Sequence, residues 1–187
     1  MLNQNLFFIA LIPFRNLREQ IRIFENDIAE RFNSFKALKV PPHITLKAPF
    51  ICNDNAKYEL LSWFSGLRIF QKEFSIQLKD FGAFDNEHKP VIYINPIVTS
   101  ELIRLQKELI AGFASLFQAY LNKVDISFKP HVTVAYRDLT PDMFEKAWKE
   151  YQHKSFDAIF DVNALHLMQH DSKQWNLVAS CNLDKGD

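Results

Sequence analysis

The chain has 187 residues and a mass of 21.9 kDa, which suits one domain of medium size. Hydrophobic residues make up 48% of it, so there is enough apolar surface for a core and intrinsic disorder is excluded. The 22 Lys and Arg balance the 22 Asp and Glu, which argues against a protein that holds long nucleic acid or an anionic membrane mainly by charge.

The N-terminal apolar segment does not have the features of a membrane anchor or export signal. Residues 6–14 are about half as long as a bilayer-spanning helix, and no Lys or Arg precedes them. Cys52 and Cys181 lie far apart and outside any zinc-binding spacing, so we expect reduced, buried thiols. Together these features predict a cytoplasmic protein.

In chain order, the first predicted elements are a strand and a long helix. Residues 6–13 are continuously apolar and end at Pro13, as expected of a buried central strand. Apolar side chains then recur at spacings of three and four over about residues 17–35, which predicts an amphipathic helix. The charged side chains expected on its water-facing side are Arg18, Glu19, Arg22 and Glu25.

Strands and helices continue to alternate along the rest of the chain. After two prolines, residues 43–47 alternate as a short strand, and residues 53–55 can cap a helix over residues 56–66. Later strands are predicted at residues 74–78, 91–97, 131–136, 156–162, 165–169 and 174–183, and later helices over residues 100–121 and after the Thr140 cap.

This order of elements predicts an internal duplication. The strands that begin near residues 6, 43 and 74 match those near residues 91, 131 and 156, with offsets of 82 to 88 residues. We therefore predict a single bilobed domain over residues 1–187, built from two β-α-β-α-β repeats at about residues 1–86 and 87–187. A pseudo-twofold arrangement would bring equivalent residues face to face.

Two matching tetrapeptides occupy equivalent strands of the predicted repeats. They read HITL at residues 43–46 and HVTV at residues 131–134, each preceded by Pro, which is a rare coincidence in a chain with six His and four Thr. Because alternate residues of a strand share a face, each His projects with its Thr, while the apolar residues point into the core. The candidate active-site residues are His43, Thr45, His131 and Thr133.

This set of side chains suits reactions at phosphorus. One imidazole can act as base toward the attacking oxygen and the other can protonate the leaving oxygen, because imidazole titrates near neutral pH. The hydroxyls of Thr45 and Thr133 would donate hydrogen bonds to the phosphate oxygens. The reaction requires no metal, so we predict no metal site and no other cofactor.

The paired motifs resemble those of the two-histidine (2H) phosphoesterase superfamily, in particular its 2′,5′ RNA ligase-like branch. The resemblance covers nearly the whole chain and includes the opening LFFIALIP and the sequence FKPHVT at residues 128–133. It implies a bilobed α+β fold, with mainly antiparallel sheets lining a central cleft, and metal-independent activity on 2′,3′-cyclic phosphates or 2′,5′ linkages. After its first motif that branch usually continues with an aromatic residue and Gly, whereas this chain has KAPF at residues 47–50, so the substrate subclass stays open.

Five further residues are candidates for substrate binding. Strand parity places Lys47 on the first polar face, and Lys129 and Arg137 on the second. Phe50 and Tyr136 lie near strand ends that can open on the cleft, where an aromatic ring can stack on a nucleobase. Phe14 shares this property. Solvated charges and core packing are the competing roles for these residues.

A small nucleotide or an RNA end carrying a cyclic phosphate or a 2′,5′ linkage is the expected partner, with no membrane and no obligate protein partner. The loops around residues 48–55 and 84–90 are the expected specificity elements. The same cleft could instead serve a binding module without turnover. A metallohydrolase is disfavoured, because Asp and Glu do not cluster beside His at ligand spacing.

Overall fold

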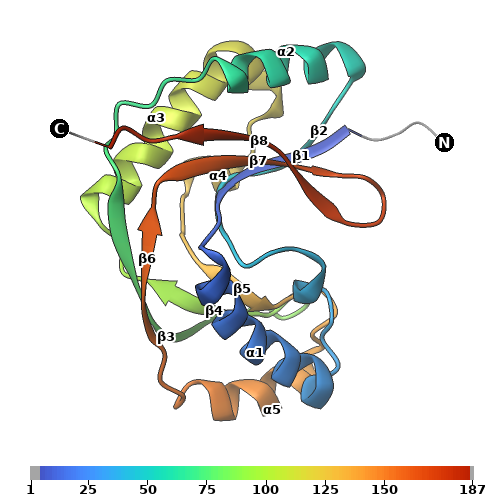
Figure 1. The fold of residues 1–187 in the computed structure, drawn as a ribbon. Coiled ribbons are helices and arrows are strands. Elements are labelled where there is room, and N and C mark those ends of the chain that lie inside the picture. Colours follow the sequence, from blue (N-terminus) through green and yellow to red (C-terminus); the bar gives the residue numbers. More distant parts are fainter. Residues whose placement is uncertain (1–4, 186–187) are drawn as a thin grey trace.

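The computed structural model describes residues 5–185, and within them eight strands form one continuous sheet (Figure 1). The strands follow the order β6-β3-β4-β5-β2-β1-β7-β8, and each neighbouring pair is antiparallel. The expected α+β class with a mainly antiparallel sheet is thereby confirmed. The strands are β1 (Asn5–Leu11), β2 (Ile44–Cys52), β3 (Phe74–Phe84), β4 (Val91–Pro96), β5 (Val132–Ala135), β6 (Asp157–Val162), β7 (Ala164–His170) and β8 (Trp175–Asn182).

The sheet narrows to a weak junction where β2 meets β5. These two strands share a single register pair, Ile44 with Val132, whereas the other neighbouring strands share three or more pairs. We call the four strands β2-β1-β7-β8 the β1 lobe, and the four strands β6-β3-β4-β5 the β4 lobe. The two motif strands therefore lie at the boundary between the lobes.

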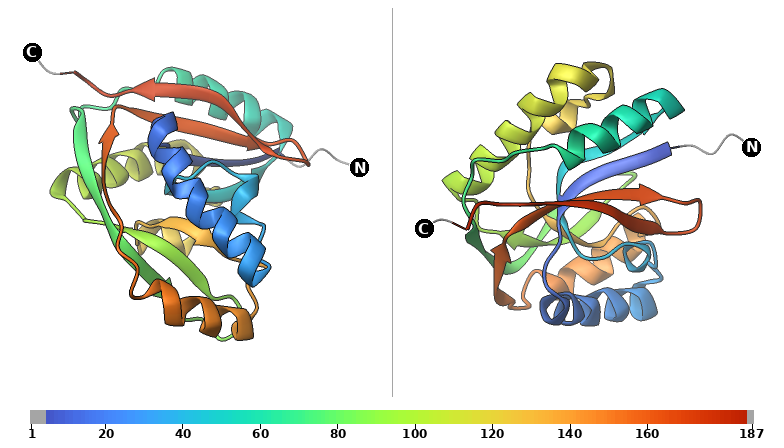
Figure 2. Two further views of the ribbon diagram at one scale, coloured as in Figure 1. Left: turned by 60° about the horizontal axis from the view of Figure 1, so that its bottom comes forward. Right: turned by 45° about the horizontal axis from the view of Figure 1, so that its top comes forward.

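Each lobe has its own helices. In Figure 1 and the right view of Figure 2, α2 and α3 lie beside the β1 lobe, and α1 lies with α5 beside the β4 lobe. The helices are α1 (Arg15–Phe32), α2 (Asp54–Ser65), α3 (Ser100–Phe117), α4 (Lys123–Ile126) and α5 (Pro141–Tyr151), with short 3₁₀ turns η1 (Ala37–Lys39) and η2 (Gln118–Tyr120).

The lobes exchange elements along the chain. Helix α1 follows β1 directly but packs against β5 and α5 of the other lobe. Strand β3, which belongs to the first predicted repeat, pairs with β4 and β6, and β7 returns to pair with β1. Each lobe thus combines strands from both predicted repeats, and the repeat boundary near residue 86 stays a prediction.

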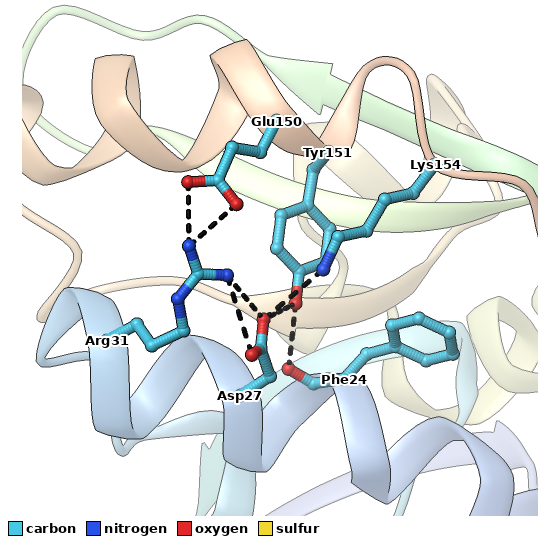
Figure 3. Close-up of polar contacts among 6 residues, drawn as sticks. All are labelled: Phe24, Asp27, Arg31, Glu150, Tyr151 and Lys154. Carbon is cyan, nitrogen blue, oxygen red and sulfur yellow. Dashed lines mark hydrogen bonds and ion pairs between the residues drawn. The ribbon is translucent and has the colours of Figure 1, made fainter.

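A polar cluster holds α1 against α5 (Figure 3). Tyr151 donates a hydrogen bond to Oδ2 of Asp27 at 2.7 Å, and Lys154 forms an ion pair with the same oxygen at 3.3 Å. Arg31 bridges Asp27 at 3.2 Å and Glu150 at 2.7 Å. Because these contacts join the two helices, they hold the C-terminal half of α1 against α5 and the residues that follow it.

The helix caps follow the sequence signals. The side chain of Asn53 accepts a hydrogen bond from the Ala56 amide, and that of Thr140 accepts one from the Met143 amide. Helix α1 ends earlier than predicted because Asn33 adopts a left-handed conformation with φ 56°, which terminates the helix.

Strand β1 is buried on both faces, which explains its continuously apolar sequence. One face contributes to the main core between the sheet and the helices. The other face contributes to a small separate cluster of Phe8, Ala10, Val40 and Met168. This second cluster lies beside the histidine of the first motif, since the Phe8 and His43 rings have centroids 4.8 Å apart.

Candidate active site

The register at the lobe junction brings the two motifs together. Since Ile44 pairs with Val132 in antiparallel strands, His43 lies across from Thr133, and Thr45 lies across from His131. Ile44 and Val132 are fully buried, so the residues on either side of them project to the opposite face.

All four motif side chains line one cavity of about 250 Å³. Thr45 and His131 also line a neighbouring cavity of about 830 Å³, which extends toward the β3–β4 loop and α4. The structure thus brings together the four residues that the sequence selected, His43, Thr45, His131 and Thr133.

Both histidines are oriented by equivalent hydrogen bonds. The Nδ1 atom of His43 lies 2.7 Å from the carbonyl oxygen of Pro41, and that of His131 lies 2.7 Å from the carbonyl oxygen of Lys129. A carbonyl oxygen can only accept, so each Nδ1 must carry a proton. The neutral rings therefore keep Nε2 unprotonated and available for proton transfer.

Both imidazoles favour the neutral form in the empty cavity. Burial lowers the pKa of His43 to about 4, because the imidazolium would lose hydration; the Pro41 carbonyl opposes this effect and the nearby His131 adds to it. Burial also lowers the pKa of His131, against the effect of the Lys129 carbonyl. A bound phosphate would oppose both shifts, because its negative charge favours the protonated ring.

Aromatic side chains that sequence reasoning missed pack beside both histidines. Phe8 of β1 lies against His43 at 4.8 Å, and Tyr93 of β4 lies beside His131 at 5.5 Å between ring centroids. Phe84 also contacts the His131 ring at 5.1 Å. Phe8 and Tyr93 are 85 positions apart, within the offset range of the predicted repeats, so overlaying those two strands could have identified them.

The prediction that Lys47 lies on the polar face with the first motif is wrong. Lys47 is fully buried, forms an ion pair with Asp125 at 3.0 Å and donates to the Ala48 carbonyl at 2.9 Å. The reason is a pair of β-bulges, because β2 has one extra residue on each side of the Lys47–Ile9 register pair. Each extra residue inverts strand parity.

Phe50 is also placed differently from its predicted role in substrate binding. It is 6% exposed and packs in the main core against Phe7, Phe113 and Tyr120. The strand extends to Cys52 rather than ending before Pro49, since the bulges accommodate the proline. Phe50 therefore supports the cleft wall from behind.

The remaining candidates lie at cavity walls. Tyr136 and Arg137 line the 250 Å³ cavity with the four motif residues, and Arg137 has φ 63° with its guanidinium 5.3 Å from the Tyr136 ring centre. Lys129 is exposed and lines the 830 Å³ cavity, together with residues of both predicted specificity loops. Phe14 is 55% exposed and lines two other cavities, outside the one that holds the motif residues.

Glu25 is a further residue that sequence reasoning misplaced. The helix pattern predicts that Glu25 faces water, yet it is 1% exposed and lines the 250 Å³ cavity with the motif residues. Burial raises its pKa to about 8, although its contact with Arg22 at 2.6 Å opposes the shift. Helix α1 packs against β5 and α5 of the β4 lobe, and this packing encloses the side of α1 that carries Glu25.

Within residues 5–185, no three His, Cys, Asp or Glu side chains are grouped so that they could hold a metal ion. None of the helices there is both long enough and apolar enough to span a bilayer.

Comparisons with known proteins agree on one family. A family model described as the 2′-5′ RNA ligase superfamily matches residues 13–174. A Bacillus cytotoxicus protein named "Putative phosphoesterase" is 26% identical over 179 residues, covering 95% of this chain and 96% of the relative. Escherichia coli LigT in complex with 3′-AMP superposes with a TM-score of 0.65 at 20% identity, covering 97% of this chain and 99% of LigT. A Thermus thermophilus protein superposes with a TM-score of 0.70 at 19% identity, with 97% and 99% coverage.

The antiparallel sheet, with paired His-x-Thr motifs on one cavity, gives this chain a LigT-like fold. More narrowly, it belongs to the 2′-5′ RNA ligase superfamily, whose model spans nearly the whole described chain.

Proposed function

We propose that the protein cleaves 2′,3′-cyclic phosphate or 2′,5′-phosphodiester bonds of small nucleotides or RNA ends. The observation that carries this proposal is the convergence of His43, His131, Thr45 and Thr133 on one cavity of about 250 Å³. The fold neighbour LigT was crystallised with 3′-AMP and with ATP, which supports a nucleotide as the ligand class.

In the proposed reaction, the phosphate lies between the two imidazoles. The neutral ring accepts a proton from water at Nε2 while the water oxygen forms a bond to phosphorus. The other ring, protonated after the phosphate has bound, donates its Nε2 proton to the leaving ribose oxygen as that oxygen's bond to phosphorus breaks. Thr45 and Thr133 donate hydrogen bonds to the nonbridging oxygens, where negative charge accumulates. A cyclic phosphate becomes a monoester, and the proton count is balanced without a metal.

We further propose that the protein works in the reducing cytoplasm. Cys52 and Cys181 are buried free thiols, and burial raises the pKa of both, which fits a structural role in that compartment.

The test is an assay of the purified protein in EDTA with 2′,3′-cyclic nucleotides and 2′,5′-linked dinucleotides, with the position of the product phosphate determined. His43→Ala and His131→Ala should each lower kcat by about 10²- to 10⁴-fold, as expected for a lost acid or base. His153→Ala is the matched control, because His153 is exposed beyond the end of α5 and lines none of the cavities described above.

Full activity in either motif variant would contradict the proposed mechanism, and loss of activity in EDTA would indicate metal chemistry. Tight nucleotide binding with no product after long incubation would instead assign the cleft to a binding module.

A further inference from the structure

A cavity of about 560 Å³ adjoins the catalytic cavity on the β1 lobe. We infer that it is a second anion site, which binds a phosphate group of the ligand other than the one held between His43 and His131. The inference rests on the proposed function for the nature of the ligand, a nucleotide or RNA end with at least two phosphate groups.

The lining of this cavity is cationic. Arg18 and Arg22 come from α1 and Lys39 from η1, and His166 projects from β7. The residues that line it within the described chain include no Asp or Glu. The side of α1 that the sequence assigned to water therefore forms one wall of an anion-attracting cavity.

Arg18 is the cation of this lining that carries a buried donor without a partner among the described residues. Its Nε atom is buried and has no hydrogen-bond partner among residues 5–185. Arg22, in contrast, is engaged by Glu25 at 2.6 Å and by the Val40 carbonyl at 3.2 Å. A buried donor without a partner is unfavourable, and a phosphate oxygen in the cavity would satisfy it.

The electrostatics of the cavity support the same interpretation. Arg18 and His166 line the same cavity, and the positive charge of Arg18 contributes to lowering the pKa of His166, after the larger effect of burial. His166 is also 3.0 Å from the Ser180 hydroxyl through Nδ1. The neutral imidazole and the guanidinium would both be able to donate hydrogen bonds to an anion.

The two cavities adjoin each other along the sheet. Val40, Pro41 and Trp175 line both of them. The Phe8 ring connects the two sides, with its centroid 4.5 Å from Trp175 and 4.8 Å from His43. A ligand with one phosphate at His43 can therefore extend past the indole of Trp175 and place a second phosphate near Arg18.

The cavity at the other end of the cleft has a different character. The 830 Å³ cavity includes Asp85 as well as Lys89 and Lys129, and it is lined by Phe84 and Phe128. Its mixed charge and aromatic rings suit a base rather than a second anion. This asymmetry assigns the second phosphate to the Arg18 side.

The test compares the binding of 3′-AMP and adenosine 3′,5′-bisphosphate by isothermal titration calorimetry. The second phosphate should tighten binding to the wild-type protein by about tenfold, the effect of one charge-assisted hydrogen bond. Arg18→Ala should abolish this gain and leave the affinity for 3′-AMP unchanged. Arg15→Ala is the control, because Arg15 lies on the same helix with its side chain 86% exposed and should keep the full gain.

A third ligand, the dinucleotide ApAp with a 3′-phosphate, separates two sources of the second phosphate. A gain only with the bisphosphate assigns the site to the 5′-phosphate of a free nucleotide, and a gain only with ApAp assigns it to the backbone of an RNA chain. Equal affinities for all three ligands, absence of binding, or a gain that survives Arg18→Ala would overturn the inference. Because the readout is binding, an Arg18-dependent gain without turnover would support the second site while contradicting the proposed phosphoesterase reaction.

Discussion

His43 and His131, which line one cavity from neighbouring strands, make the same hydrogen bond. In each case Nδ1 lies 2.7 Å from the carbonyl oxygen two residues upstream, that of Pro41 or Lys129. The equivalence fixes both tautomers alike and leaves Nε2 of each neutral ring unprotonated. Burial is the main feature that sets the proton affinity of each ring.

The first prediction concerns the titration of His43. Its pKa of about 4 in the empty protein means that the ring is neutral at pH 7 and gains a proton only well below it. Saturation with 3′-AMP should raise the midpoint by about one pH unit or more, because an adjacent anion favours the imidazolium. Histidine NMR resonances followed against pH measure both values. His131→Ala should raise the midpoint in the empty protein, since a repelling neighbour is removed, and a free-protein midpoint at or above 6.5 would contradict the prediction.

The second prediction concerns the buried pair of Lys47 and Asp125. Asp125→Asn should lower the free energy of unfolding by about 3–5 kcal/mol, because it leaves the Lys47 ammonium buried without a counter-charge. The double variant Lys47→Met/Asp125→Asn should recover part of this loss, since Met can fill the space beside the Phe50 and Phe113 rings. Urea unfolding of the wild type and of both variants measures these changes.

Lys36→Met is the control for replacing a lysine by methionine. Because Lys36 is exposed, this variant should change the free energy of unfolding little. A double variant as unstable as Asp125→Asn alone would show that the ammonium charge is not the cause of the destabilisation.

The third prediction concerns the close approach of Gly82 to Tyr93. A Cβ atom at residue 82 would lie 2.6 Å from Cε2 of Tyr93, the ring that packs beside His131. Gly82→Ala should therefore lower stability by about 1–3 kcal/mol through overpacking and also reduce phosphoesterase turnover. Gly112→Ala is the matched control, because the nearest atom is 3.7 Å away, and it should stabilise α3 by up to about 1 kcal/mol. Wild-type turnover in Gly82→Ala would show that the position of the Tyr93 ring does not affect catalysis.

The fourth prediction concerns Glu25 and the pH dependence of stability. Burial raises its pKa from 4.5 to about 8, so between these values the folded protein holds a proton that the unfolded chain has released. The contribution of Glu25 is therefore full below about pH 4.5 and is lost as the pH rises to about 8, with a slope of up to about 1.4 kcal/mol per pH unit. Urea unfolding of the wild type and Glu25→Gln over this range should show the decline only in the wild type. Parallel curves for the two proteins would contradict the prediction.

Most elements could be predicted from local sequence. The continuously apolar β1, the caps at Asn53 and Thr140, and the two His-x-Thr strands are all encoded by neighbouring residues. Lys47 and Phe50 could not be placed in the same way, because the bulges in β2 are defined by its register with β1. The burial of Glu25 depends in turn on the crossing of α1 to the other lobe.

By itself, the amino-acid sequence determined the elements, the two motifs and the family resemblance, since these depend on spacings of two, three and four residues. Tertiary structure decided which cation faces the cleft. Lys47 is buried by inverted strand parity, whereas Arg18, which the helix pattern assigned to solvent, lines a cavity because the facing β1 lobe encloses that side of α1. The physical reason is that periodicity defines the faces of an element, while only the packing of distant segments decides what each face meets.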